Sequence, residues 1–137
     1  MADERDIITL AKTVYGEARG EGEDGRLAVA HVVLNRFKSG RWFGRDTIAD
    51  TALMDWQFSC WNPNDPNREL LENIDLDDPD FQHCMYAALG AVLGYLPDNT
   101  SGATHYYAYD VIERPKWADP SKSVGRIAGH EFYKGID

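Results

Sequence analysis

The stretch Val14-Tyr15-Gly16-Glu17-Ala18-Arg19-Gly20-Glu21 ends an amphipathic helix that we expect to begin near Asp3. The apolar residues of this helix recur at steps of three and four and predict one buried stripe, made of Ile7, Leu10, Ala11, Val14 and Ala18. Glu17 follows Val14 by three residues, so its carboxylate projects from the same side as the stripe. Because an isolated buried charge is costly, Glu17 must meet either a cationic partner or a cleft.

Glu17 therefore has two interpretations. In the first it is a general acid held in an apolar pocket, as carboxylates often are at sites that cleave sugars. In the second it is an ordinary ion-pair partner of Arg19 or Arg36. Gly16 would let another segment or a ligand approach the backbone closely, and we expect Gly20 and Gly22 to end the helix.

Length and composition predict one globular domain over residues 1–137, with 43% apolar and 12% aromatic residues. The net charge of −9 argues against a nucleic-acid partner and against attraction to anionic membranes. Two cysteines, Cys60 and Cys84, are too few for a disulfide framework, and the sequence leaves open whether they pair. The N-terminus has no signal-peptide core and no stretch approaches 18 apolar residues, so we expect synthesis in the cytoplasm and no membrane insertion.

The next segments also favour helices. Residues 23–38 are apolar nearly all round, which is typical of a central helix packed on several sides. Asn35 and Arg36 at its end either cap the helix or line a cleft beside Glu17. A short helix is expected over residues 47–54, and a longer one runs from Pro79 to Gly94 after an acidic loop.

The last third of the chain favours strands. Residues 103–109 have the aromatic and β-branched content of a strand, and residues 127–133 could form a second strand antiparallel to it. Helices early and strands late indicate an α+β domain, mainly helical, with a small antiparallel sheet near the C-terminus.

Two segments could supply a sugar-binding wall. In the aromatic segment 56–61, Gln57, Phe58 and Ser59 could face a glycan, although large hydrophobic residues are equally typical of a core. On the strand, Thr104 and Tyr106 share one side and His105 takes the other. We therefore expect Thr104 and Tyr106 to share a groove with Glu17.

Together these pieces resemble the SleB/CwlJ family of bacterial cell-wall hydrolases over almost the whole chain. The segments that carry the resemblance come in family order: AKTVYGEARGE (11–21), AVAHVVLNR (28–36), WQFSCWN (56–62), GATHY (102–106), PKWA (115–118), and Ile127 with His130 and Phe132-Tyr133. The resemblance implies a fold similar to lysozymes and lytic transglycosylases, peptidoglycan as substrate, and Glu17 as the catalytic acid. Unlike the spore enzymes, this chain is expected to have neither a signal peptide nor a separate peptidoglycan-binding domain, and we therefore expect a phage-type lysin or a hydrolase of a non-sporulating bacterium.

Only one carboxylate, Glu17, has a strong motif around it, which favours a lytic transglycosylase that cuts the β-1,4 bond after N-acetylmuramic acid and needs a single carboxylate. A hydrolytic muramidase would need a second, and Glu21 is the obvious candidate unless it perturbs Glu17 or anchors the next loop. A zinc amidase is a further alternative, with His105 and His130 as ligands, but no compact metal-binding spacing is present. A non-enzymatic glycan-binding module would leave Glu17 without a role.

We thus expect a monomer that binds peptidoglycan glycan strands without a metal or cofactor. Glu17 is the expected catalytic residue. The expected substrate-binding residues are Glu21, Asn35, Arg36, Gln57, Phe58, Ser59, Thr104, Tyr106 and Trp117.

Overall fold

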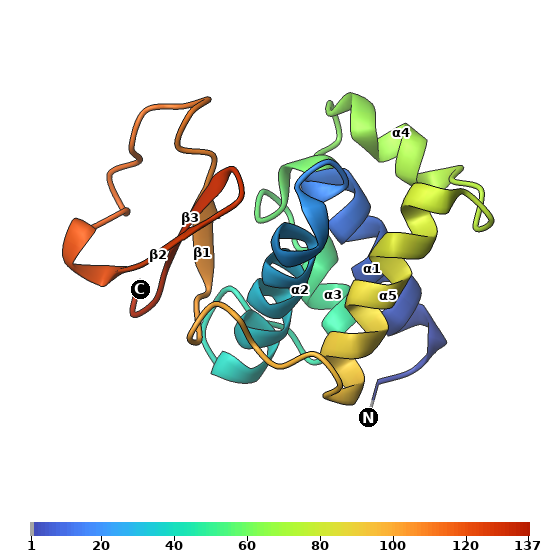
Figure 1. Cartoon of the computed structure of the whole chain (residues 1–137), viewed down its shortest axis with the longest axis horizontal. Coiled ribbons are helices and arrows are strands. Elements are labelled where there is room, and N and C mark those ends of the chain that lie inside the picture. The colour runs from blue at the N-terminus through green and yellow to red at the C-terminus, as the bar shows by residue number, and fades with distance from the viewer. Residues whose placement is uncertain (1) are drawn as a thin grey trace.

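Residues 2–137, which the computed structural model describes, form a helical part and a small sheet beside it (Figure 1). The expected α+β class is confirmed. The helices are α1 (Glu4–Ala18), α2 (Gly22–Ser39), α3 (Ile48–Leu53), α4 (Pro66–Glu72) and α5 (Pro79–Leu93), with a 3-10 turn η1 (Ser59–Trp61). The strands are β1 (His105–Tyr107), β2 (Ser123–Ile127) and β3 (His130–Tyr133), with a second 3-10 turn η2 (Pro120–Lys122) before β2.

Helix α1 is fixed at its start by a reciprocal capping box. The Asp3 side chain accepts a hydrogen bond from the Asp6 amide, and Asp6 accepts one from the Asp3 amide. The other Asp6 oxygen accepts a hydrogen bond from the Ala49 amide at 2.9 Å, which joins α1 to α3. The predicted stripe is buried except at its first residue, with Leu10, Ala11 and Val14 fully buried, and α1 packs against α2, α3, α4 and α5.

Helix α2 is the central helix that the sequence predicts. It is buried almost continuously from Ala28 to Leu34 and packs against α1, α3, α5 and strand β2. Gly40 and Gly94 end α2 and α5 in the left-handed conformation, as expected for helix C-termini. Helix α2 begins at Gly22, whose φ is +78°, one residue before the start that the sequence predicted. None of the helices formed by residues 2–137 combines the length and the apolar character needed to cross a membrane.

The sheet is antiparallel with the order β1-β3-β2. The expected pairing of the first and last strands is confirmed, with Tyr106 opposite Phe132. The predicted strand 127–133 was wrong in extent, because Ile127 belongs to β2 and a tight turn separates it from β3. Strand β2 itself was missed, since Gly125 has a φ of +116° and the register shifts there, which breaks the alternation that marks a strand.

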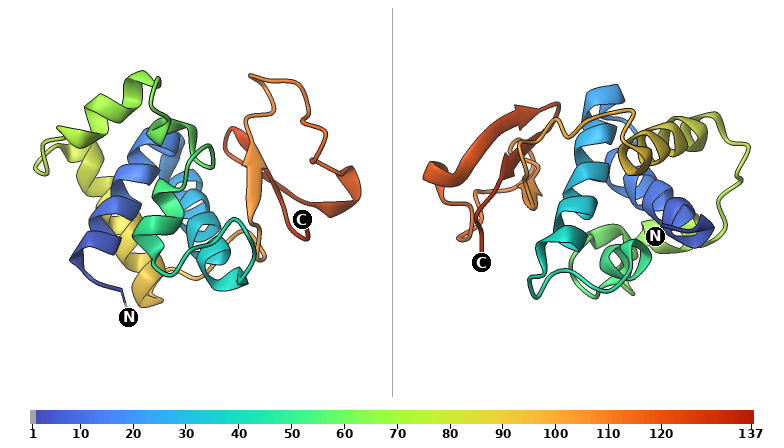
Figure 2. Two further views of the ribbon diagram at one scale, coloured as in Figure 1. Left: turned by 180° about the vertical axis from the view of Figure 1, so that it is seen from behind. Right: turned by 90° about the horizontal axis from the view of Figure 1, so that it is seen from below.

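Figures 1 and 2 show the sheet to one side of the helical part, next to α2, in every view. The connection from α5 to β1 is held by Asn35, whose side-chain amide donates to Asp98 at 3.0 Å and to the Ala103 carbonyl at 2.9 Å. Tyr106 and Phe132 on the inner side of the sheet pack against the helical core. The sheet is therefore anchored to α2, and β1 is presented to the end of α1.

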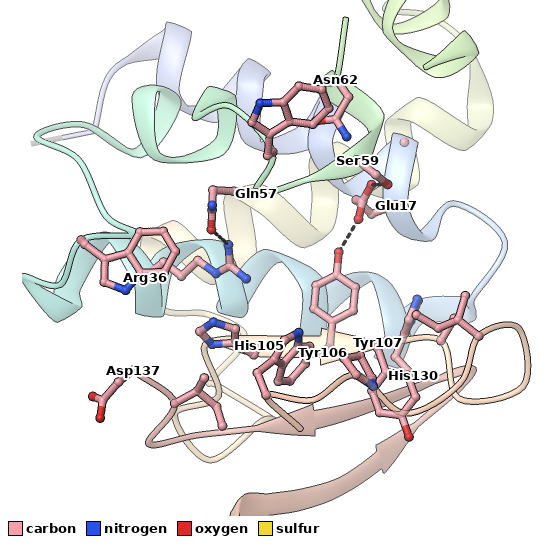
Figure 3. Close-up of a pocket in the computed structure, with 18 residues that line it drawn as sticks. Glu17, Arg36, Gln57, Ser59, Asn62, His105, Tyr106, Tyr107, His130 and Asp137 are labelled. Atoms are coloured by element: carbon pink, nitrogen blue, oxygen red, sulfur yellow. Dashed lines mark hydrogen bonds between the residues drawn. The ribbon is translucent and has the colours of Figure 1, made fainter. Parts of the chain in front are cut away.

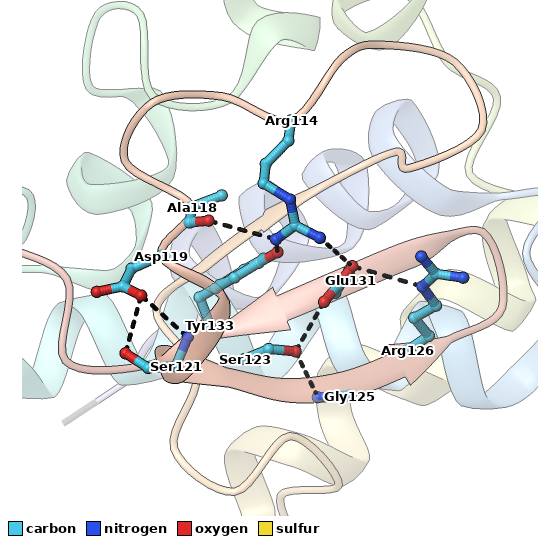
Figure 4. Close-up of polar contacts among 9 residues, drawn as sticks. All are labelled: Arg114, Ala118, Asp119, Ser121, Ser123, Gly125, Arg126, Glu131 and Tyr133. Carbon is cyan, nitrogen blue, oxygen red and sulfur yellow. Dashed lines mark hydrogen bonds and ion pairs between the residues drawn. The ribbon is translucent and has the colours of Figure 1, made fainter.

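Glu131, on the central strand β3, holds the long 108–122 loop against the sheet through Arg114 (Figure 4). Ser123 donates a hydrogen bond to Glu131 at 2.8 Å, and the guanidinium groups of Arg126 and Arg114 lie 3.4 and 3.9 Å away. Arg114 also donates to the Tyr133 hydroxyl at 2.6 Å. Burial alone would raise the pKa of Glu131, but these hydrogen bonds and charges outweigh it and lower the pKa below its ordinary 4.5.

Replacing Glu131 by Gln should destabilise the protein at neutral pH, because it removes the negative charge that Arg114 and Arg126 contact. The loss should be only about 1 kcal/mol, since both arginines are partly exposed and water screens their charges. The folded-state pKa is lowered, so this stabilisation is present above pH 4.5 and is lost as the pH falls through the folded-state pKa. Urea unfolding at neutral and acidic pH measures the difference. Glu113→Gln, an exposed change in the same loop, is the control, and a Glu131→Gln effect that grows on acidification would contradict the account.

Candidate active site

A cleft of about 610 Å³ lies between the helical part and the sheet (Figure 3). Its walls come from the end of α1, the end of α2, the segment 56–62, strand β1 and the loop after it. The lining residues are Gly16, Glu17, Arg36, Trp42, Trp56, Gln57, Ser59, Asn62, His105, Tyr106, Tyr107, Ala108, Ile112, Pro115, Trp117, His130, Ile136 and Asp137. Segments 40 or more residues apart in the sequence thus meet at the C-terminal end of α1.

The Glu17 carboxylate is held by donors from both walls. Tyr106 of β1 donates its hydroxyl hydrogen to Oε1 at 2.6 Å, and on the other wall the Cys60 amide and the Ser59 hydroxyl lie 3.1 and 3.3 Å from Oε2. In residues 2–137 no lysine, arginine or histidine comes within 4.0 Å of this carboxylate. The ion-pair interpretation is therefore wrong: Arg19 instead donates to the Tyr15 carbonyl and stacks on the Tyr15 ring.

Gly16 allows the 59–61 turn to pack closely against the end of α1. A Cβ at this position would lie 2.6 Å from the Cys60 Cβ and 2.8 Å from its sulfur, closer than real Cβ atoms come. The absent side chain lets the Cys60 amide reach Glu17. This confirms the expectation of a close approach at Gly16, and the partner is the aromatic segment itself.

Tyr106 is a neutral donor at any physiological pH. Burial raises its pKa well above the ordinary value, and the neighbouring Glu17 charge raises it further. Its ring is fixed by edge contact with His130, at 4.8 Å between centroids, and by Phe132 at 5.6 Å. The hydroxyl is therefore aimed at Glu17 by the packing of the sheet.

Replacing Tyr106 by Phe should lower catalytic activity by about 10-fold without unfolding the protein. The ring contacts remain, but Glu17 loses the short hydrogen bond that orients it. Initial cleavage rates on purified peptidoglycan, with thermal unfolding as the fold check, measure this. Tyr109→Phe is the matched control, because it removes a hydroxyl that donates to the Ala128 carbonyl and not to Glu17. Equal rates for the two variants would contradict the proposed orientation.

Arg36 joins the two walls behind the cleft. Its Nε donates to the Thr104 carbonyl at 2.6 Å and its Nη1 to the Gln57 side-chain oxygen at 3.0 Å (Figure 3), while the guanidinium stacks on Phe58 at 4.6 Å. Burial lowers the pKa of Arg36 to about 10, against the opposing effects of Tyr106 and Glu17. It therefore stays charged at neutral pH and contributes positive potential near Glu17.

The two cleft histidines are uncharged at neutral pH. Burial and then the Arg36 charge lower the pKa of His105 to about 4, and its ring packs between Phe43 and Trp117. Burial also lowers the pKa of His130, although Glu21 and Glu17 oppose this. Among residues 2–137 no group of three or more His, Cys, Asp or Glu lies close enough together to hold a metal ion, so the ligand set of the zinc alternative is not assembled there.

The structure separates the expected substrate-binding residues into two groups. Arg36, Gln57, Ser59, Tyr106 and Trp117 line the cleft with Glu17. Phe58, Asn35, Thr104 and Glu21 do not. Direct contact of any of these residues with substrate stays a prediction.

Each residue outside the cleft has a structural task. Phe58 is 1% exposed and supports Arg36 from the core. Thr104 precedes β1, so the alternation along the strand does not place it beside Tyr106. Its hydroxyl bonds to His105 and its carbonyl to Arg36, and His105 lines the cleft in its place.

Glu21 lies in a separate hollow that Arg126 and Ala128 share. Its Oε1 lies 3.4 Å from His130 Nδ1. A Cβ on Gly25 would lie 2.6 Å from the Glu21 Cβ, and one on Gly129 would lie 2.5 Å from Oε1. The Glu21 side chain therefore occupies space that is open only because both positions are glycine. Glu21 thus anchors the β2–β3 turn to the start of α2, which is one of the roles that the sequence left open.

Several cleft residues were missing from the sequence prediction, notably Trp42, Trp56, Asn62, Tyr107 and His130. Trp56 directly precedes the predicted sugar-binding residues 57–59, and its place in that aromatic segment could have indicated that it lines the cleft. The position of His130 depends on where the β2–β3 turn docks, and nothing local in the sequence indicates it.

A mainly helical domain with a side sheet, and a cleft that meets a glutamate at a helix end, defines the lysozyme-like class of α+β domains. The chain belongs to the cell wall hydrolase family, whose sequence model matches residues 20–133. The match begins after Glu17, whereas alignments to curated relatives cover 93–96% of the chain.

Two of these relatives are spore cortex-lytic enzymes. That of Oceanobacillus iheyensis is 34% identical over 140 residues, covering 96% of this chain and 42% of the relative. That of Bacillus subtilis is 32% identical over 133 residues, covering 93% of this chain and 37% of the relative. The chain therefore spans about two fifths of the length of the curated relatives it matches.

Solved structures give the same fold. The catalytic domain of the germination-specific lytic transglycosylase SleB from Bacillus anthracis superimposes with a TM-score of 0.73 at 28% identity, covering 97% of both chains. The catalytic domain of Bacillus cereus SleB gives a TM-score of 0.66 at 24% identity, with 98% of this chain and 93% of that chain covered.

Proposed function

We propose that this protein cleaves the glycan strands of peptidoglycan, at the β-1,4 bond between N-acetylmuramic acid and N-acetylglucosamine, as a lytic transglycosylase. The observation that carries the proposal is the Glu17 carboxyl group, which has no ion-pair partner among the described residues and is oriented inside an open cleft by the Tyr106 hydroxyl, the Cys60 amide and the Ser59 hydroxyl. Membership of the cell wall hydrolase family supplies the substrate class. Residues 1–137 would then be one catalytic domain that acts on the cell wall.

The proposed first step is proton donation. Glu17 gives its proton to the glycosidic oxygen as the bond from that oxygen to C1 of the muramic acid breaks, and positive charge develops at the sugar ring. The Tyr106 hydroxyl, the Cys60 amide and the Ser59 hydroxyl then stabilise the carboxylate that remains. They are in place before the reaction, so the charge develops without reorganisation.

The second step returns the proton. The Glu17 carboxylate accepts a proton from the sugar's own 6-hydroxyl, whose oxygen attacks C1 and closes a 1,6-anhydro ring. No water is consumed, and Glu17 ends in the protonated form in which it began. The same carboxyl group thus serves as acid and then as base.

The scarcity of carboxylates in the cleft supports this mechanism over simple hydrolysis. Among the described residues that line the cleft, the only other carboxylate is Asp137, which forms an ion pair with Arg41 and lies across the cleft in Figure 3. Glu21 faces a different hollow. A hydrolytic glycosidase normally needs a second carboxylate placed beside the reacting sugar.

Mass spectrometry of the products formed from purified peptidoglycan tests the proposal. Anhydro-muramic ends are expected. Reducing muramic ends would replace the transglycosylase with a muramidase, and released stem peptides on intact glycan would overturn glycan cleavage altogether.

A further inference from the structure

The turn that leads into the 56–62 segment carries a backbone conformation that its sequence does not favour. The Gln57 amide donates to the Met54 carbonyl at 3.2 Å, so residues 54–57 form a tight turn. Trp56 is the third residue of this turn and has a φ of +64°. In a turn with a positive φ only at this position, glycine or asparagine is normally found, because a side chain there meets the backbone.

Packing does not explain why a tryptophan occupies this position. The Trp56 side chain is 69% exposed and lies outside the hydrophobic core clusters. An exposed bulky residue in the left-handed region is a sparse conformation, and such conformations concentrate at functional sites. Trp56 lines the cleft together with Gln57 and Ser59.

The other residues of the cleft indicate which ligand the Trp56 ring could contact. Trp42, which is 58% exposed, and Trp117 also line the cleft, so flat apolar faces recur along it. Polar groups line the same cleft, namely the Gln57 amide held by Arg36 and the Glu17 carboxylate. A cleft that combines aromatic faces with polar groups suits a pyranose chain, whose rings present C–H faces and whose edges carry hydroxyl and acetamido groups.

We infer that Trp56 is a stacking platform for one N-acetylated pyranose ring of the glycan strand, and that the left-handed turn at residues 54–57 exists to present it. The inference rests on the proposed function, since it assigns a subsite of the same cleft. It makes Trp56 a binding residue that holds the strand for Glu17 without taking part in the chemistry.

The test uses the unfavourable positive φ of residue 56. Trp56→Gly removes the ring and at the same time puts the residue that favours a positive φ into the turn, so stability should rise while binding falls. Ser101→Gly is the matched control, because Ser101 has a φ of +56° in a turn outside the cleft. Both changes relieve the same backbone conformation, and only one removes the platform.

Binding is measured by calorimetry with peptide-free glycan strands, in a Glu17→Gln background where no cleavage occurs. Trp56→Gly should raise the dissociation constant about 5- to 10-fold and raise the melting temperature by about 2–4 °C. Ser101→Gly should raise the melting temperature similarly with binding unchanged, and Trp56→Phe should keep the dissociation constant within about 3-fold of the parent.

The outcomes separate this inference from the function on which it rests. Binding by Trp56→Gly within twofold of the parent, or a fall in its melting temperature, would overturn the assignment of Trp56 alone. A parent protein that does not bind glycan strands at all would overturn the proposed substrate and this subsite together.

Discussion

Replacing Glu17 by Gln should lower the rate of peptidoglycan cleavage by about two to four orders of magnitude while the fold stays intact. Gln has the same shape and still accepts hydrogen bonds from the Cys60 amide and the Ser59 hydroxyl through its oxygen. Its amide group can face the Tyr106 hydroxyl oxygen in place of Oε1. What is lost is a group that can donate a proton in the first step and accept one in the second, because a carboxamide does neither.

The measurement is the initial rate of clearing of a purified peptidoglycan suspension, with the melting temperature as a check of the fold. Glu23→Gln is the matched control, because Glu23 is exposed in the first turn of α2 and does not line the cleft. It should clear at the wild-type rate. A Glu17→Gln rate within about threefold of wild type would remove Glu17 from the mechanism.

Replacing Arg36 by Met should destabilise the protein by about 2–4 kcal/mol. Arg36 is 5% exposed, and Met fills similar space without the donors. The Thr104 carbonyl and the Gln57 side-chain oxygen would then lose their partner inside the joint between α2 and the sheet. The stacking on Phe58 would also lose its electrostatic part.

Urea unfolding monitored by tryptophan fluorescence measures this loss. Arg5→Met is the matched control, since Arg5 pairs with Asp50 at 3.1 Å on the surface with both side chains more than half exposed. Its effect should stay below about 0.5 kcal/mol. Equal effects for the two variants would mean that Arg36 does not hold the sheet to the helical part.

The helices could be predicted from the sequence because their signals are local. The buried stripe of α1, the Asp78 cap and Pro79 at the start of α5, and Gly94 at its end each lie within the segment that they define. The same stripe predicted the direction of Glu17. Alternation along β1 predicted that Tyr106 would face it, and the hydrogen bond between the two confirms this placement.

The rest of the site depends on contacts between distant segments. Thr104 was expected in the cleft, but the strand begins one residue later, and boundaries are the weakest part of a sequence prediction. The position of Glu21 depends on Gly25 and Gly129, which are distant in the sequence and both contact its side chain in the fold. The positive φ of Trp56 occurs in a turn that lacks the usual glycine. Neither has a local signal that could have revealed it.

The central claim is that Glu17 acts alone, as acid and then as base, so that no water enters the product. Digestion of purified peptidoglycan in ¹⁸O-labelled water, followed by mass spectrometry of the glycan ends, tests this most directly. The account predicts anhydro-muramic ends without ¹⁸O, formed by the wild type and absent with Glu17→Gln. Muramic ends that carry one ¹⁸O atom would show that water is the nucleophile and would contradict it.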